Sequence, residues 1–464
     1  MELRDWVVEA VEAVAVWSAG WGRYEPHDSL AVPDELMAER FAELRARLAD
    51  NYPYFHPRYA GQMLKPPHPA AVVGYLTAML INPNNHALDS GPATAQMEKE
   101  AVAALAAMFG LPEHLGHLTS SGTIANLEAL FVARETHPGR AVAFGEDSHY
   151  THARMCGLLG ISTRVVPADA AGRMDLDAVE TVLRAGDVGT VVVTPGTTGL
   201  GAIDPVDQVL TLARQHGVRV HVDAAYGGFY TLLAGEPDGL PAAPWRAVAE
   251  CDSVVVDPHK HGLQPYGCGA VLFRDPSVGR FYRHDSPYTY FTSTDLHLGE
   301  ISLECSRAGA AAAALWLTLQ VLPLTPDGLG AVLAANLRSA RRWARLIEGA
   351  EHLRLYQEPQ LDIVTYFPVT EPLRAAAIDR ASAAVMQAGM TGADPVFLSV
   401  LQVTADALTR RHPQVTGPGG ARVLRSVLMK PESEDYLDHL HQRVTDLAAA
   451  LRRDPADSTD PGRA

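Results

Sequence analysis

The sequence predicts an α/β protein with a mostly parallel sheet that is covered on both faces. Short apolar runs without polar alternation recur through the middle of the chain, and amphipathic stretches separate them. Strands of this kind are buried on both faces, and the intervening helices supply the crossovers that parallel strands need. After about residue 325, helical stretches surround a few isolated strands, which predicts a smaller α+β domain at the carboxyl end.

Residues 1–95 are predicted to form helices that wrap around the rest of the protein. The apolar period is helical, but proline-rich breaks interrupt it in YPYFHPRY, LKPPHPAAV and INPNNHALDSGP. Because proline lacks a backbone donor and ends helices, short helices joined by extended loops are expected here.

Residues 96–325 are predicted to form the large domain. A helix in TAQMEKEAVAALAAMFG opens it, and further helices are expected over residues 175–183 and 205–215. The expected strands are AVAF near Ala143, TRVV near Val165, TVVVT ending at Thr194, VRVHVD ending at Asp223 and SVVVD ending at Asp257.

Residues 326–464 are predicted to form the small domain. The segment LPLTPDGLG marks the boundary, and two helical stretches flank the expected strands DIVTYF and VLRSVLM. The polar tail DPADSTDPGRA is expected to be disordered.

Composition and charge exclude several classes of protein. The 464 residues carry a formal net charge of −16, which argues against a nucleic-acid partner because phosphate binding needs basic patches. Four cysteines without CxxC or zinc spacing, an acidic amino terminus and the lack of a long apolar run predict a reduced, cytoplasmic protein with no membrane segment. The close histidine pairs lack a third ligand, so no metal is expected.

The informative polar residues follow predicted strands. Asp223 ends one strand, and Lys260 comes just after the next. Upstream, TSSGT at residues 119–123 lies between an inferred strand and a helix expected to begin near Ala125. Ligands of open α/β sheets bind outside the carboxyl ends of the strands, and a helix amino terminus with hydroxyl groups suits a phosphate.

These residues form the set that pyridoxal phosphate requires. A lysine binds the aldehyde as a Schiff base, a carboxylate keeps the pyridine nitrogen protonated, and a helix amino terminus holds the phosphate. The sequence therefore predicts pyridoxal 5'-phosphate as the cofactor.

The segment SVVVDPHKHGLQPYGCGAVLFR resembles the cofactor-lysine signature of the group II pyridoxal-phosphate-dependent amino-acid decarboxylases. Other segments resemble that family in the same order, which extends the resemblance over most of residues 50–325: HPRY, TSSGTIANLEAL, SHYTHARMCGLLGI, TPGTTGLGAIDPV, HVDAAYGG and LECSRAGAAAAALW. The resemblance implies the aspartate-aminotransferase-like fold type I, with a large, mostly parallel sheet of the seven-stranded type.

The resemblance also implies roles for individual residues. Lys260 would carry the internal aldimine, and Asp223 would pair with the pyridine nitrogen. His149 would stack on one ring face, Ala225 would pack on the other, and Thr198 would lie near the ring hydroxyl or the imine. The residues expected near the phosphate are Ser121, Gly122, Thr123 and His259.

Tyr288 and Tyr290 are the candidates for the proton donor to Cα, because related decarboxylases place a tyrosine on a loop after the lysine. Tyrosine at this place favours an amine product over oxidative aldehyde formation. Asp257 departs from the Asn or Ser of many relatives, and its carboxylate would repel a phosphate, so it is a poor phosphate ligand. Arg307 and Arg425 have two interpretations: a contact with the substrate carboxylate, or a structural ion pair.

The expected reaction converts an L-amino acid to its amine and carbon dioxide. An aminotransferase, a carbon–carbon lyase or aldehyde synthase, and a non-catalytic pyridoxal-binding protein remain alternatives on the same scaffold. Aromatic, acidic and small aliphatic substrates all remain open. Because relatives are dimers, a homodimer with active sites at the interface is expected.

Overall fold

The computed structural model describes residues 1–282 and 297–453, and a sheet of seven strands lies at its centre. The strands run in the spatial order β1-β7-β6-β5-β4-β2-β3. Their bounds are β1 (Leu115–Thr119), β2 (Ala141–Gly145), β3 (Thr163–Val166), β4 (Val188–Val193), β5 (Arg219–Asp223), β6 (Ser253–Val256) and β7 (Gly269–Phe273).

Strand β7 alone runs against the others, because it pairs antiparallel with both β1 and β6. The remaining pairs are parallel. The carboxyl ends of β1, β2, β4, β5 and β6 therefore meet at one edge of the sheet. The mostly parallel sheet predicted from the sequence is confirmed.

Helices cover both faces of this sheet. Val254 and Val256 point into one core cluster, whereas Val255 between them points into another, so β6 is buried on both faces. This explains why its apolar run does not alternate with polar residues. The helices of this part are α4 (Pro92–Met108), α5 (Gly122–Thr136), α6 (Thr151–Leu159), α7 (Leu176–Arg184), α8 (Val206–Gln215), α9 (Ala242–Arg246) and α10 (Gly309–Val321). The short 3-10 turns are η1 (Asp28–Leu30), η2 (Leu88–Ser90), η3 (Gly228–Leu233), η4 (Ala247–Glu250), η5 (Pro276–Phe281) and η6 (Leu298–Ile301).

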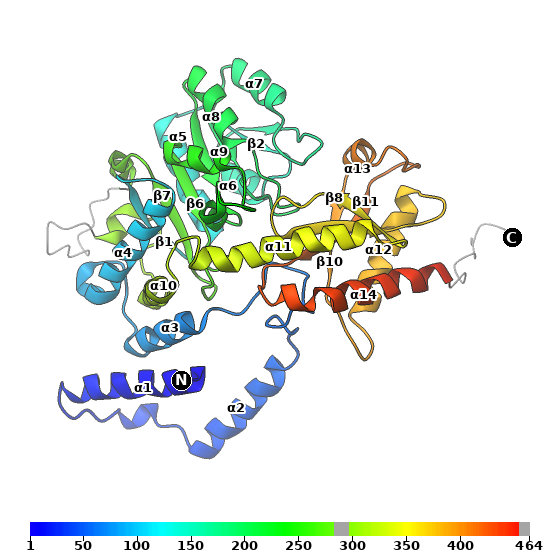
Figure 1. Cartoon of the computed structure of the whole chain (residues 1–464). Coiled ribbons are helices and arrows are strands. Elements are labelled where there is room, and N and C mark those ends of the chain that lie inside the picture. Colours follow the sequence, from blue (N-terminus) through cyan, green and yellow to red (C-terminus); the bar gives the residue numbers. More distant parts are fainter. Residues whose placement is uncertain (283–296, 454–464) are drawn as a thin grey trace.

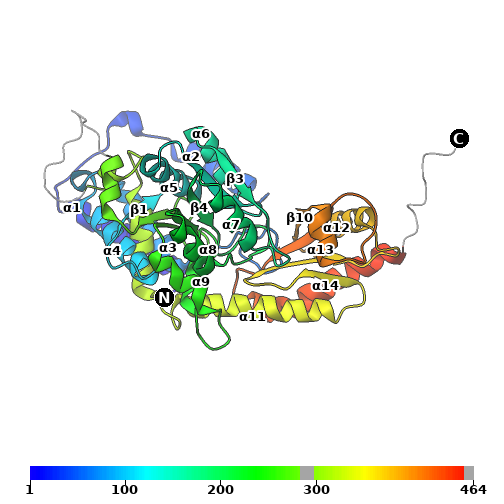
Figure 2. The same ribbon diagram turned by 90° about the horizontal axis from the view of Figure 1, so that it is seen from above.

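A second, antiparallel sheet of four strands forms towards the carboxyl end, in the order β10-β11-β9-β8. Helix α11 leads from the large sheet to this small one, as the view from above in Figure 2 shows. Trp343 of α11 packs against Tyr366 of the small sheet, with 5.3 Å between ring centroids. The elements are β8 (Leu353–Gln357), β9 (Ile363–Pro368), β10 (Ser399–Val403), β11 (Ala421–Val427), α11 (Leu329–Glu348), α12 (Ala375–Gly389), α13 (Ala405–Arg411) and α14 (Ser433–Arg453).

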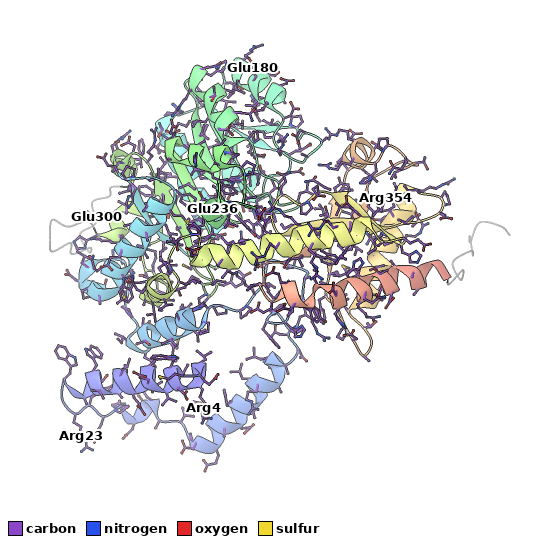
Figure 3. All side chains as sticks on the ribbon, viewed as in Figure 1. Arg4, Arg23, Glu180, Glu236, Glu300 and Arg354 are labelled. Carbon is purple, nitrogen blue, oxygen red and sulfur yellow. The ribbon has the colours of Figure 1, made fainter. Side chains whose placement is uncertain are left out.

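The first helices, α1 (Leu3–Ala19) and α2 (Asp34–Leu48), form an arm that projects from the body, and α1 lies beside α3 (Pro69–Ile81) (Figure 1). Figure 3 shows the labelled side chains of Arg4 and Arg23 on this arm, away from both sheets. Apolar side chains of the arm are also exposed, among them Trp17, Trp21 and Phe41.

The sequence placed the parallel strands to within one residue at their carboxyl ends, since β4 ends at Val193 and β6 at Val256. Helix α5 begins at Gly122, earlier than the expected start near Ala125, because the Ser121 side chain accepts a hydrogen bond from the backbone N–H of Ile124 and caps the helix. Within the described ranges, no helix combines the length and apolar character that a membrane span requires.

Candidate active site

A cavity of about 250 Å³ opens at the edge of the large sheet where the carboxyl ends of the parallel strands meet. The loops after β1, β2, β4, β5 and β6 each contribute to its lining. The lining residues are Ser121, Gly122, Thr123, Asn126, His149, Tyr150, Thr151, Thr194, Gly196, Thr198, Asp223, Ala225, Tyr226, Asp257, His259 and Lys260.

Lys260 stands at one side of this cavity, in the loop after β6. Its Nζ lies 3.0 Å from Oδ2 of Asp257, which is almost fully buried. The other oxygen of Asp257, Oδ1, has no hydrogen-bond partner among the described residues. A primary amine that faces a cavity can attack an aldehyde carbon.

Asp223 lies at the end of β5 and is 4% exposed. Its Oδ2 accepts a hydrogen bond from His152 Nε2 at 2.8 Å, and its Oδ1 accepts one from the Ala225 backbone N–H at 3.2 Å. Burial by itself raises the pKa of Asp223, but the hydrogen bond from His152 and the electrostatic effects of His152, His221 and Lys260 together outweigh burial and lower this pKa below its ordinary value. Asp223 is therefore an ionised carboxylate that faces the cavity.

The amino terminus of α5 forms the third wall. The first N–H groups of a helix point out of its amino terminus, and with the hydroxyl groups of Ser121 and Thr123 in the cavity lining this end of α5 suits an anion. Gly122 is required here, because a Cβ at this position would overlap the carboxylate of Asp257. A carboxylate thus already lies close to the place where an anionic ligand would bind.

His149 and Thr198 line the cavity from two other loops. His149 Nδ1 lies 2.7 Å from the Thr151 hydroxyl, and burial lowers the pKa of His149, so its ring is neutral near pH 7. Thr198 belongs to a loop whose backbone carbonyl groups accept hydrogen bonds from Arg425.

The structure brings the sequence-predicted cofactor residues together around one cavity: Ser121, Gly122, Thr123, His149, Thr198, Asp223, Ala225, His259 and Lys260. Tyr288 and Tyr290 lie outside the described residues. The sequence patterns did not single out Asn126, Tyr226 or His152 as members of the site. A strand-end search finds loop residues, whereas Asn126 and His152 lie inside helices, so only the packing of α5 and α6 on the sheet reveals them.

The two arginines with open interpretations take structural positions. Arg307 Nη1 lies 2.7 Å from Glu98 Oε1, and it also donates to the carbonyl oxygen of Leu118. Arg425 donates to the carbonyl oxygens of Thr198 and Gly199 at 2.7 and 3.0 Å. Neither side chain lines the cavity. Within the described part of the chain, no group of His, Cys, Asp and Glu residues is placed to hold a metal ion.

An amine, an ionised carboxylate and a helix amino terminus around one cavity fit the aldehyde, the ring nitrogen and the phosphate of pyridoxal phosphate. The unpartnered oxygen of Asp257 does not favour the phosphate. Together with the mostly parallel sheet and the small antiparallel sheet, this site defines a fold type I pyridoxal-phosphate enzyme.

Comparison with known proteins gives the family. The conserved domain of the pyridoxal-dependent decarboxylases matches residues 51–367, and the chain belongs to this family. It is 29% identical over 421 residues to L-tyrosine decarboxylase of Enterococcus faecium, covering 69% of each chain. It is 31% identical over 309 residues to a probable L-tyrosine/L-aspartate decarboxylase of Methanoculleus marisnigri, covering 66% of this chain and 80% of that protein.

Among solved structures, mouse CSAD has a similar fold, with a TM-score of 0.77 at 23% identity, and the match covers 91% of this chain and 90% of that one. The family match shows that the protein is a pyridoxal-phosphate-dependent decarboxylase of L-amino acids. The predictions of cofactor, fold and enzyme class are thereby confirmed.

Proposed function

We propose that Lys260 binds the cofactor covalently and that Asp223 pairs with its ring nitrogen, while Ser121, Gly122 and Thr123 hold the phosphate. The observation that carries this assignment is the single cavity that Lys260, Asp223 and the amino terminus of α5 share. When bound, the cofactor withdraws the electrons that the departing carbon dioxide leaves on Cα. An ionised Asp223 holds a positive charge on the ring nitrogen and so supports that withdrawal.

The other lining residues fix the orientation of the ring in this proposal. The neutral ring of His149 stacks on one face, and the small Ala225 lets the other face approach the backbone. Thr198 is assigned to the ring hydroxyl or the imine, and His259 is assigned to the phosphate. The proposed proton donors to Cα are Tyr288 and Tyr290.

A Lys260→Ala variant tests the assignment directly. Borohydride reduction of the wild-type holoenzyme should fix the cofactor on the peptide that contains Lys260, and the variant should remain unlabelled. The rate of carbon dioxide release should fall by at least about a hundredfold, because the amine that binds the cofactor and exchanges with the substrate is gone. Labelling of a different lysine would overturn the assignment.

For the substrate, we propose an L-amino acid of the classes on which the relatives act, with L-tyrosine and L-aspartate tested first. Both are named for the relatives in the comparison. A panel of the twenty amino acids, assayed for amine and carbon dioxide in equal amounts, identifies the substrate. A keto acid or an aldehyde as the main product would contradict the proposal.

We further propose a cytoplasmic homodimer with active sites at the interface. Single exposed apolar residues are common on monomers, but a contiguous set of large ones usually marks an interface. On the arm, Trp17 is 51% exposed and Trp21 81%, and their ring centroids lie 6.3 Å apart. A second copy that packs on α1 and α2 would cover them. Sedimentation should give a dimer at micromolar concentration, and a fully active monomer would contradict this.

A further inference from the structure

His152 contacts the carboxylate of Asp223 from behind the cavity. It lies in the first turn of α6, is fully buried, and is not among the residues that line the cavity. Its Nε2 lies 2.8 Å from Asp223 Oδ2, and since a carboxylate only accepts, Nε2 carries the donated proton. Its Nδ1 has no hydrogen-bond partner among the described residues, so the bond to Asp223 is the one hydrogen bond of this ring there.

A second chain of hydrogen bonds reaches the other oxygen of Asp223. Burial lowers the pKa of His221 to about 3, so its ring is neutral. The amide oxygen of Asn126 can only accept, so His221 Nε2 donates to it at 2.9 Å, and His221 Nδ1 accepts from Ser253 Oγ at 2.8 Å. Asn126 Nδ2 then lies 3.4 Å from Asp223 Oδ1.

All of these donors point towards Asp223. Hydrogen bonds that run in one direction polarise one another, and in a buried place they act with little screening by solvent. The titratable groups that face Asp223 are His152 of α6, His221 on its own strand, Lys260 after β6 and His149 before α6. Of these, His152 donates directly to the carboxylate.

We propose that His152 is a positioning residue that acts through Asp223: it fixes the carboxylate towards the cavity and keeps it ionised, and so holds the proton on the ring nitrogen of the cofactor. The inference rests on the role proposed above for Asp223. Its geometrical basis is separate, because it depends on contacts behind the cavity rather than on the lining itself.

The test compares His152→Leu with His152→Gln in the holoenzyme. Glutamine can place an amide N–H where Nε2 stands, whereas leucine cannot donate. For His152→Leu, the dissociation constant of pyridoxal phosphate should rise about tenfold, the size expected for a lost hydrogen bond to a charged group. The value of kcat should fall about tenfold with KM within about twofold, because the carboxylate is needed most when electrons enter the ring.

The absorbance of the bound cofactor gives a readout that a purely structural role would not move. The pH at which its spectrum changes should rise by about one unit in His152→Leu, because a ring nitrogen without its proton no longer withdraws electrons from the lysine-linked nitrogen. For His152→Gln, the affinity for the cofactor should stay within about threefold of the wild type. The pH at which its spectrum changes should stay within a few tenths of a unit. The matched control is His412→Leu. Among the described hydrogen bonds, the ring of this buried histidine bonds only to the carbonyl oxygen of Tyr356, so its loss should leave the spectrum unchanged.

Asp223→Asn separates the two levels of the proposal. If Asp223→Asn changes the spectrum and the affinity but His152→Leu does not, the inference about His152 is wrong and the role of Asp223 stands. If neither variant has an effect, the proposed role of Asp223 fails as well. Should His152→Leu not fold, His152→Asn replaces it, because the shorter amide cannot reach Asp223; equal behaviour of the Asn and Gln variants then refutes the inference.

Discussion

Replacing Tyr226 by phenylalanine removes one hydroxyl group that joins the cavity wall to Asp362, the residue directly before β9 of the small sheet. The Tyr226 hydroxyl donates to Oδ1 of Asp362 at 2.5 Å, and the Asp362 carboxylate is fully buried. His261 approaches the other oxygen of Asp362 at 3.4 Å without forming a hydrogen bond. The variant therefore removes a hydrogen bond that offsets the cost of burying the Asp362 carboxylate.

The expected loss follows from the charge on Asp362. A hydrogen bond to a charged group contributes about 1.5–3 kcal/mol, against about 1 kcal/mol between neutral groups. We therefore expect Tyr226→Phe to lower the free energy of unfolding by about 2–3 kcal/mol at pH 8. The matched control is Tyr366→Phe, because the buried Tyr366 hydroxyl lies 3.1 Å from the hydroxyl of Ser426, a neutral partner. Tyr366→Phe should lower the free energy of unfolding by about 1 kcal/mol.

The pH dependence sharpens this test. Burial raises the pKa of Asp362 to about 6. Since the pKa of this acid is raised in the folded protein, its contribution to stability is complete below about pH 4 and is lost as the pH rises through 6. The bond to Tyr226 becomes charge-assisted over the same range, so the cost of Tyr226→Phe should fall towards about 1 kcal/mol at pH 5. Urea unfolding followed by circular dichroism measures the free energy of unfolding of each variant at pH 5 and pH 8. Equal losses of this free energy for Tyr226→Phe and Tyr366→Phe at pH 8 would refute the reasoning.

Two further predictions concern buried carboxylates. Asp257→Asn removes a negative charge beside Lys260 and the amino terminus of α5, so the dissociation constant of pyridoxal phosphate should fall about tenfold in a fluorescence titration of the apoenzyme, and weaker binding would contradict this. Burial raises the pKa of Asp204 to about 6, although its carboxylate accepts hydrogen bonds from the N–H groups of Met174 and Thr194. Its contribution to stability is complete below about pH 4 and is lost as the pH rises through 6. Between pH 4 and pH 7, the free energy of unfolding of the wild type should therefore fall by about 3 kcal/mol relative to that of Asp204→Asn. A difference between the two that does not change with pH, measured by denaturant unfolding, would count against this assignment.

The large sheet is well predicted from the sequence because its inner strands β4, β5 and β6 are buried on both faces. An uninterrupted apolar run such as that of β6, with helices on either side along the chain, is typical of a strand in a parallel sheet, and the strand ends then point to Asp223 and Lys260. The antiparallel direction of β7 leaves no such signal, because the direction of a strand depends on the path of the loop before it rather than on its own residues.

The contacts behind the cavity depend on how the helices pack on the sheet. The spacing of His149 and His152 does not reveal that one lines the cavity while the other faces Asp223, because this depends on where α6 begins relative to β2. Asn126 likewise meets His221 and Asp223 only because α5 packs on β5 and β6. Arg307 looks the same in sequence whether it meets a substrate or, as here, Glu98.

The hydrogen bonds of Arg425 determine which segments a fragment of the protein must contain to keep the cavity wall in place. This side chain belongs to the small sheet, yet it holds the loop that carries Thr198, and it also lies 3.3 Å from the carbonyl oxygen of Gly61. A fragment that ended at residue 325 would keep Lys260 and Asp223 but lose the hydrogen bonds from Arg425 to the loop that carries Thr198. A unit that keeps every contact of this cavity wall therefore includes the segment around Gly61 and both sheets.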